Sequence, residues 1–318
     1  MRTIQINKND ANQRLDKFLT KRFKTMPKSL MYKYIRTKYI KVNGKRCEIS
    51  TRLNEGDVIT FYIKDEFFDE PQYDTYDFLK APKKLDIVYE DENIILLNKP
   101  TGLLCHPDEN YHFDSLLARI QHYLYDKGEY NPKDENSFAP ALANRIDRNT
   151  GGIVIAAKNS ESLRILNQKI KDRELKKLYL CVVHGIPKKK QAVLVDYLEK
   201  NEKQNRVYIS KKSTENSKTI KTKYTVLKEL NNMSLVEVEL LTGRTHQIRA
   251  HMAYIGHPLV GDGKYGTNKQ NRNTSLKWQA LCSYKLVFAF ETDGGILNYL
   301  NGKSFEIKDI WFKEYISF

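Results

Sequence analysis

The chain has 318 residues and carries 54 Lys and Arg against 39 Asp and Glu, a formal net charge of +15. A hydrophobic content of 40% can fill the cores of one large and one small domain, and the charge favours an anionic partner, nucleic acid before an acidic membrane surface. No apolar run approaches transmembrane length, and the N-terminus lacks the pattern of a signal peptide. We therefore expect a cytoplasmic protein with no membrane partner.

Positive charge is densest at the N-terminus. Residues 1–64 hold 16 Lys and Arg against 5 Asp and Glu, a net of +11. Residues 65–79 hold 6 acidic residues and no basic one, and residues 80–318 are again basic, with a net of +10. This distribution predicts a small basic module, an acidic linker and a larger domain.

Residues 10–64 have the pattern of a small folded module. Apolar residues spaced for a helix begin at Leu15, and a second short helix is expected from Ser29. Asn43-Gly44 is a strong hairpin signal, and Val58–Ile63 is expected to be the last strand. Four cations fall on or beside the outer side of the second helix: Lys28, Lys33, Arg36 and Lys38. They predict phosphate contacts with nucleic acid, and a solvated charged face is the alternative.

Three pieces of this module resemble a known RNA-binding domain. QRLDKFL, YIRTKYIKVNGK and LNEGDVITFYI are similar to the S4-like domain, and the resemblance covers nearly all of residues 12–63. It implies binding of structured RNA. We therefore predict an S4-like α/β RNA-binding domain over residues 1–64 and an acidic linker over residues 65–84 that lets this domain move.

The remaining residues, 85–318, are predicted to form one large α+β domain. Asn93–Asn98 is typical of a buried strand, and Asp114 or Ser115 can cap the helix that follows. Residues 188–223 hold 11 Lys and Arg against 4 Asp and Glu, which predicts a positive flap or hairpin. Short strands among a few helices favour a mainly antiparallel sheet, and the further elements expected are strands at Ile153–Ala157, Leu178–Val183, Lys223–Leu227 and Leu235–Leu241 and a helix at Glu161–Asp172.

The first chemical cluster lies between Ala141 and Lys158. A polar run meets Gly151-Gly152, which permit a tight turn or a close backbone approach before a buried strand. Asp147 is the only carboxylate of this segment and stands between Arg145 and Arg148, whose guanidinium groups are expected to hold it ionised. A charged carboxylate on a loop fixed to a strand suits a nucleophile or a base, and Arg148 is a candidate for contact with RNA. A surface ion pair is the alternative.

The second chemical cluster is Thr242–His251. His246 and His251 are five residues apart and do not share a helix face, and no third ligand is near, so we reject a metal site and expect both histidines in a polar core. Arg244 and Arg249 suit a buried carboxylate or a phosphate, and Arg244 is a candidate for contact with RNA. The sequence has no Walker loop, no G-x-G-x-x-G and no C-x-x-C, so no cofactor is expected.

The large domain resembles the RluA family of pseudouridine synthases. The matching pieces are NKPTGLLCHP, NRIDRNTGGIVIAAKN, KKLYLCVVHG and LLTGRTHQIRAHMAYIGHPLVGDGKYG, in the family's order, over most of residues 85–290. The resemblance implies a mixed, mainly antiparallel sheet with a central cleft. It also implies isomerisation of uridine to pseudouridine in RNA without a cofactor.

The resemblance also assigns roles to single residues. Asp147 matches the catalytic aspartate, and Arg145 matches the arginine linked to base flipping. Tyr179 matches the active-site tyrosine that lies against the target base, and Arg249 matches the arginine that pairs with the catalytic carboxylate. These matches imply that Arg249 of the second chemical cluster pairs with Asp147 of the first.

The sequence thus predicts a monomeric pseudouridine synthase that acts on structured RNA, 23S ribosomal RNA in the first place. Transfer RNA is the alternative substrate. A non-catalytic RNA-binding or ribosome-assembly protein is the alternative from another class. The joint presence of Asp147, Tyr179 and Arg249 favours the enzyme, because RNA binding alone needs none of the three.

Overall fold

The computed structural model describes residues 1–68, 76–108, 113–272 and 274–313. The chain divides into two compact units. Unit 1 comprises residues 1–84, 107–141 and 157–163, and unit 2 comprises residues 85–106, 142–156 and 164–318. The domain boundaries expected at residues 64 and 84 stay predictions.

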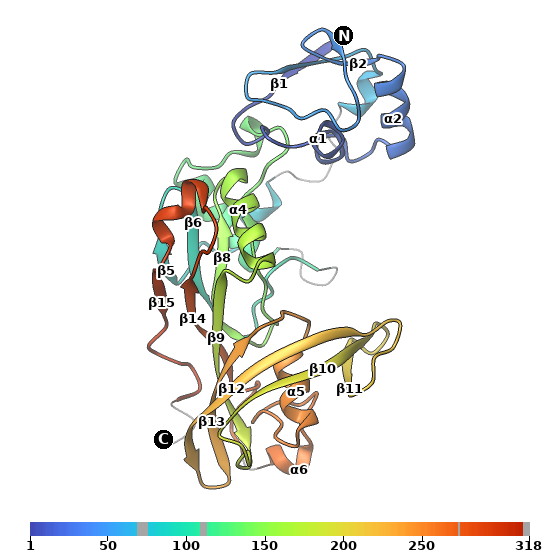
Figure 1. The fold of residues 1–318 in the computed structure, drawn as a ribbon. Helices are drawn as coiled ribbons and strands as arrows, with labels where there is room; N and C mark the ends of the chain where they lie inside the picture. The colour runs from blue at the N-terminus through green and yellow to red at the C-terminus, as the bar shows by residue number, and fades with distance from the viewer. Residues whose placement is uncertain (69–75, 109–112, 273, 314–318) are drawn as a thin grey trace. The chain divides into compact units, whose positions relative to one another are not determined.

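The N-terminal part of unit 1 combines two helices with a small antiparallel sheet (Figure 1). The helices are α1 (Leu15–Arg22) and α2 (Lys28–Arg36). The strands that the described residues form here are, in sheet order, β1 (Arg2–Gln5), β4 (Val58–Phe61), β2 (Ile40–Val42) and β3 (Lys45–Arg46). The predicted hairpin is confirmed, because Asn43 and Gly44 join β2 to β3 with φ of 50° and 71°, the positive angles that a tight hairpin turn needs.

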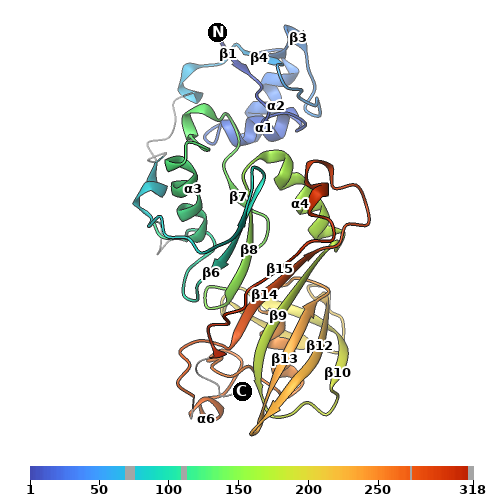
Figure 2. The ribbon, with the colours of Figure 1, turned by 90° about the vertical axis from the view of Figure 1, so that its left-hand side faces the viewer.

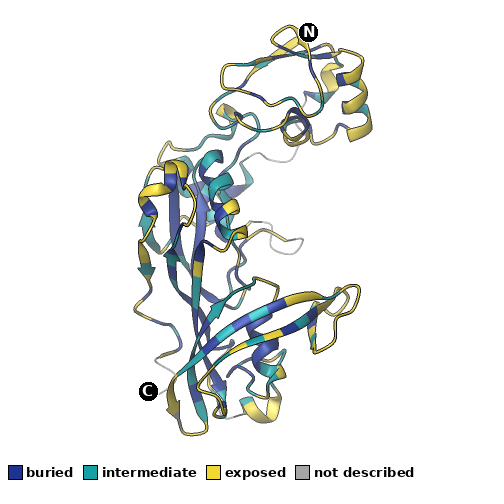
Figure 3. Cartoon of the chain, in the orientation of Figure 1, coloured by how far each residue is buried: buried dark blue, intermediate teal, exposed yellow. Residues whose placement is uncertain are grey.

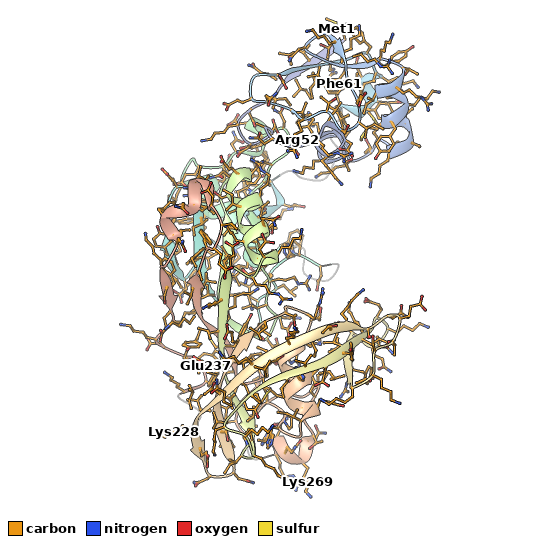
Figure 4. The ribbon with its side chains drawn as sticks, in the orientation of Figure 1. Met1, Arg52, Phe61, Lys228, Glu237 and Lys269 are labelled. Carbon is orange, nitrogen blue, oxygen red and sulfur yellow. The ribbon has the colours of Figure 1, made fainter. Side chains whose placement is uncertain are left out.

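An apolar core holds this module together. The rings of Phe23, Phe61 and Phe68 meet edge to face, with centroids 5.1 to 5.5 Å apart, and Figure 4 shows Phe61 inside the module. Met31 and Ile35 of α2 are buried against the same core. The opposite side of α2 is open to solvent (Figure 3), and three of the predicted cations, Lys28, Lys33 and Arg36, are exposed there. Lys38 is also exposed but lies two residues beyond the end of the helix.

The rest of unit 1 surrounds one longer helix, α3 (Leu116–Asp126). Of the two expected caps, Ser115 is the one used, since its Oγ accepts a hydrogen bond from the N–H of Ala118 at 3.2 Å. Phe78 and Ala81, from the predicted acidic linker, pack against Ala118. Residues 69–75 of that linker lie outside the described residues, so its mobility stays a prediction. The short 3-10 helices of unit 1 are η1 (Asp65–Phe67), η2 (Asp77–Lys80) and η3 (Pro132–Asp134).

One large mixed sheet organises unit 2 (Figure 2). Within the described residues its order is β11-β10-β12-β13-β9-β14-β8-β6-β5, with β15 beside β14 and β7 beside β8. β14 and β8 run parallel, and the other pairs whose register is known are antiparallel, as predicted. The strands are β5 (Ile87–Glu90), β6 (Ile94–Lys99), β7 (Ala141–Leu142), β8 (Gly151–Ala157), β9 (Leu175–His184), β10 (Gln191–Asn201), β11 (Arg206–Ser210), β12 (Lys218–Leu230), β13 (Met233–Leu240), β14 (Leu281–Phe288) and β15 (Ser304–Glu306).

Strand β8 is the rigid element behind the first chemical cluster. Each of its seven residues is buried, as expected for an apolar run inside a sheet. Gly151 and Gly152 lie within the strand, so of the two predicted uses of this pair the close backbone approach is the correct one. Gly152 has φ of +118°, and a Cβ built there would lie 2.4 Å from the carbonyl oxygen of Ser283 on β14.

The basic segment 188–223 forms strands, as predicted, but they are longer than the sequence pattern indicates. β10 pairs with β11 on one side and with β12 on the other. The remaining helices are α4 (Ser160–Lys171), α5 (Gln247–Tyr254), α6 (Asn268–Asn271) and the 3-10 helix η4 (Gly295–Leu300). No helix among the described residues is long and apolar enough to cross a membrane.

Candidate active site

The Asp147 loop is held by a buried lysine. Lys99, at the end of β6, is fully buried, and its Nζ donates to the carbonyl oxygens of Pro100, Leu103 and Arg148 at 2.7 to 2.9 Å. Burial lowers the pKa of Lys99 to about 8. Its three acceptors come from the segment after β6 and from the loop before β8, so this one ammonium group ties the two segments together and fixes the backbone beside Asp147.

Arg249 of α5 joins two carboxylates. Its Nε and Nη2 donate to Asp262 at 2.7 and 2.9 Å, and its Nη1 donates to Asp147 Oδ2 at 3.2 Å. The backbone N–H groups of Lys264 and Tyr265 also donate to Asp262, at 2.8 and 3.1 Å. Asp262 therefore orients the guanidinium plane, and the remaining edge of that plane faces Asp147.

The charges of this trio differ in their exposure. Asp262 is fully buried, Arg249 is nearly so, and the Asp147 side chain keeps 25% of its surface exposed. Burial alone would raise the pKa of Asp262, but the hydrogen bonds and charge of Arg249 outweigh it and lower that pKa from its ordinary value of 3.8. Asp262 is thus ionised at neutral pH and anchors Arg249, while the Asp147 side chain is partly exposed to solvent.

His246 and Tyr265 complete this side of the site. His246 immediately precedes α5 in a left-handed conformation, with φ of 53°, and its Nε2 lies 3.8 Å from Asp147 Oδ2. Its Nδ1 is 3.0 Å from the Tyr265 hydroxyl, and the guanidinium of Arg249 lies over the Tyr265 ring at 5.3 Å. Burial lowers the pKa of His246, and the Asp147 carboxylate opposes that shift. An imidazole beside Asp147 was not predicted from the sequence.

Strand β9 supplies the opposite wall. Tyr179 is buried, and burial raises the pKa of its hydroxyl above the ordinary value of 10, while a hydrogen bond with Ser283 opposes the shift. The hydroxyl therefore stays protonated near neutral pH. Lys177 lies two residues earlier and so on the same face of the strand. A Cβ built on Gly243 would lie 4.0 Å from Lys177 Nζ, and burial lowers the pKa of this lysine.

Lys177 and His246 are among the residues that line a cavity of about 350 Å³. Asp147, Tyr179 and Arg249 meet in it, so the structure brings the three predicted catalytic residues together. The predicted RNA-contact residues Arg145 and Arg244 also line it, and both are exposed. Arg148 is exposed outside this lining, where its Nε donates to the Gly102 carbonyl oxygen at 3.0 Å.

The guanidinium that bonds to Asp147 comes from a distant part of the chain. It belongs to Arg249, 102 residues later, the pairing that the family resemblance implies, while the expected effect of the flanking Arg145 and Arg148 on the Asp147 charge stays a prediction. The side chains of neighbouring loop residues point in different directions, whereas α5 faces the Asp147 loop across the cavity. The ion pair is therefore tertiary rather than local.

The histidines of the second cluster lie in polar surroundings, as expected. His251 is fully buried, with Nδ1 2.9 Å from Thr222 Oγ1 and Nε2 2.9 Å from Asp196 Oδ2. Gln247, one turn earlier on α5, donates from Nε2 to the same Thr222 hydroxyl at 2.9 Å. These bonds fasten α5, and with it Arg249, to β10 and β12. Among the described residues, no group of three or more His, Cys, Asp and Glu could hold a metal ion.

Four residues of the candidate site were not assigned to it from the sequence: Lys99, Lys177, His246 and Asp262. Two of them carried a local signal, since Lys99 precedes a Pro-Thr-Gly turn and Asp262 stands between two glycines. Lys177 carried only its spacing of two from Tyr179. The role of His246 depends on a backbone turn that the sequence did not reveal.

Comparisons with known proteins identify the family of this chain. A family model described as RNA pseudouridylate synthase matches residues 93–254, and an S4 domain matches residues 13–59. The chain belongs to the RNA pseudouridylate synthase family, and its resemblance to the RluA family is confirmed.

Curated relatives span most of the chain. An uncharacterised RNA pseudouridine synthase of Mycoplasma genitalium is 34% identical, over 89% of this chain and 88% of that protein. Ribosomal large subunit pseudouridine synthase C of Buchnera aphidicola is also 34% identical, over 83% of this chain and 81% of its own. The solved structure of human RNA pseudouridylate synthase domain containing 1 has the same fold, with a TM-score of 0.57 at 20% identity over 78% of this chain and 90% of that one.

Proposed function

We propose that this pseudouridine synthase isomerises uridines of 23S ribosomal RNA with Asp147 as its catalytic carboxylate. The observation that carries the proposal is the bond from Arg249 Nη1 to Asp147 Oδ2, in a cavity that also holds Tyr179. The ribosomal substrate is supported by relatives named ribosomal large subunit pseudouridine synthase C and by the S4 domain. Action as a monomer in the cytoplasm stays a prediction.

The reaction requires one bond to break and another to form. The C1′–N1 bond of the uridine breaks, the uracil turns, C1′ joins C5, the C5 proton leaves to solvent, and N1 takes up a proton. The uridine must first leave its base stack, which costs a few kcal/mol. Phosphate contacts from cavity cations offset that cost, and we assign them to Arg145, Lys177 and Arg244.

Lys177 is the cation best placed for a substrate phosphate. It is half-buried, and within the described residues no carboxylate lies within ion-pair distance of its ammonium group. A desolvated charge without a counter-ion is unfavourable, so an anion that enters the cavity is stabilised there. The lowered pKa of Lys177 reports the same desolvation.

Asp147 has three chemical options. The carboxylate can attack C1′, attack C6, or remove the 2′ proton. In every case the bond from Arg249 orients the carboxylate. Tyr179 supplies a ring for the base and a protonated hydroxyl for proton transfer.

The test is tritium release from RNA labelled at uridine C5, with ribosomal and transfer RNA assayed separately. We expect release from ribosomal RNA by the wild-type protein and none by Asp147→Asn, an isosteric change that removes the charge. Release from transfer RNA alone would show that the substrate is transfer RNA and not ribosomal RNA. Turnover by Asp147→Asn close to the wild-type rate would overturn the assignment of the carboxylate.

A further inference from the structure

A second cavity, of about 620 Å³, adjoins the first. Asp147, His246 and Arg249 line both cavities, so the candidate catalytic carboxylate lies where the two meet. A volume of this size is typical of a ligand site. The reaction at one uracil needs only the first cavity, so the second is free for another part of the substrate.

The second cavity is strongly cationic. Arg206, Lys264 and Lys277 line it, and none of them forms an ion pair with a carboxylate within the described part of the chain. Lys264 donates from Nζ to the carbonyl oxygen of Asn205 at 2.7 Å. Burial lowers the pKa of Lys264, and the nearby positive charges of Arg249 and Arg206 lower it further. Such an excess of unpaired positive charge favours phosphate.

The same cavity has an aromatic wall. Trp278 is half-buried there, and Lys277 Nζ lies 5.2 Å from the centre of its ring. The backbone at Trp278 is closely packed, since a Cβ built on Gly261 would lie 2.4 Å from the Trp278 carbonyl oxygen. An indole among lysine and arginine side chains is a combination by which proteins hold unpaired nucleotides, through base stacking and phosphate contacts.

We infer that the second cavity binds the nucleotide next to the target uridine, with its base against Trp278 and its phosphate at Arg206 and Lys264. The inference rests on the proposed function, in which the first cavity receives the flipped uridine. Withdrawal of that uridine from its stack leaves a neighbour without a stacking partner, and Trp278 replaces the lost contact. Because every base has a flat face, this site strengthens binding without reading the identity of the neighbour.

Intrinsic fluorescence tests this directly, because Trp278 and Trp311 are the two tryptophans of the chain. The probes are uridine 5′-monophosphate and triuridylate, titrated into the full-length wild type and Trp278→Phe. We expect triuridylate to quench the emission strongly and the mononucleotide to do so weakly, with the difference lost in Trp278→Phe. RNA bound at the S4 domain is silent, since residues 13–59 hold no tryptophan.

Affinity provides the second readout. Trp278→Leu should weaken triuridylate binding by roughly five- to 150-fold and leave mononucleotide binding unchanged, whereas Trp278→Phe should retain most of the affinity. Arg206→Gln and Lys264→Gln should each lower the slope of log affinity against log salt by about 0.7. Equal quenching by the two probes, or an unchanged triuridylate affinity in Trp278→Leu, would overturn the inference.

The tritium assay separates this inference from the proposed function. Quenching by triuridylate without any tritium release would refute the proposed function and support the nucleotide site. Tritium release without preferential quenching by triuridylate would support the proposed function and refute the nucleotide site.

Discussion

The cations of α2 and the cation of Arg249 show two opposite uses of positive charge. Lys28, Lys33 and Arg36 stand on an exposed helix face, where water solvates each of them. Arg249 is nearly buried and bonds to Asp262 and Asp147. Exposed cations contribute additively, so the loss of one has a small effect. A buried cation is held in one geometry, and its loss leaves a buried carboxylate without a partner.

This contrast separates the tasks of the two regions. We expect the N-terminal module to set how tightly RNA is held and how strongly salt weakens the complex. We expect the Arg249 trio to set whether a bound uridine reacts. Each prediction below changes one of the two kinds of charge, or the backbone that holds the buried kind in place.

Removal of the buried cation should have the largest effect. Arg249→Met leaves Asp262 buried without its two charged hydrogen bonds, so we expect the free energy of unfolding to fall by about 3–5 kcal/mol and turnover to be lost. Urea denaturation measures the first and tritium release the second. The control is Arg249→Lys, which keeps the charge but cannot bridge two carboxylates. Its free energy of unfolding and its turnover should lie between those of wild type and Arg249→Met. A loss below about 1 kcal/mol in Arg249→Met would refute the anchoring role of Asp262.

The same variant predicts a change in pH dependence. The pKa of Asp262 is lower in the folded state than its ordinary value of 3.8, so its stabilisation is present above that value and is lost as the pH falls through the folded pKa. The stability of wild type relative to Arg249→Met should therefore shrink in acid. An advantage of wild type that is constant from neutral pH to pH 3 would contradict this linkage.

A methyl group on the supporting strand should have the next largest effect. In Gly152→Ala the Cβ meets the Ser283 backbone at 2.4 Å with φ of +118°, and neither strand can move without opening the sheet. We expect a loss of about 2–4 kcal/mol in unfolding free energy. Gly151→Ala is the matched control, because the nearest atoms to its Cβ belong to the Trp311 side chain, at 3.1 and 3.3 Å, and the Lys99 carbonyl oxygen lies at 3.5 Å, an ordinary contact distance. Equal losses in both variants would contradict a special constraint at Gly152.

Single exposed cations should have the smallest effect. Lys33→Gln should change the free energy of unfolding by less than about 0.5 kcal/mol. If Lys33 contacts one phosphate, the slope of log affinity against log salt should fall by about 1, as measured in binding titrations at several salt concentrations. The control is Lys228→Gln, an exposed lysine of β12 (Figure 4). A slope that is the same in wild type and Lys33→Gln would show that this face of α2 does not meet phosphate.

Local pattern was enough to predict what is local in this molecule. The exposed face of α2, the Asn43-Gly44 hairpin and the buried run of β8 each depend on neighbours within a few residues. The prediction that Asp147, Tyr179 and Arg249 share one site came from family resemblance, because no periodicity of the sequence links residues so far apart.

The remaining features needed three-dimensional packing. Arg249 is 13 residues from Asp262, and the bond between them depends on the turn that follows α5. The three acceptors of Lys99 and the left-handed turn at His246 are likewise set by backbone geometry. The sequence contained each residue, but the partner of each was decided by the tertiary fold.

The central claim is that chemistry depends on the paired carboxylate and affinity on the exposed cations. The most direct measurement is single-turnover tritium release at saturating ribosomal RNA for two variants, Asp147→Asn and the combined Lys28→Gln, Lys33→Gln, Arg36→Gln and Lys38→Gln. We predict a rate at background for the first, with RNA binding retained. We predict a rate close to wild type for the second, at a higher RNA concentration. A substantial rate for Asp147→Asn, or a rate for the combined variant that saturating RNA does not restore, would contradict the account.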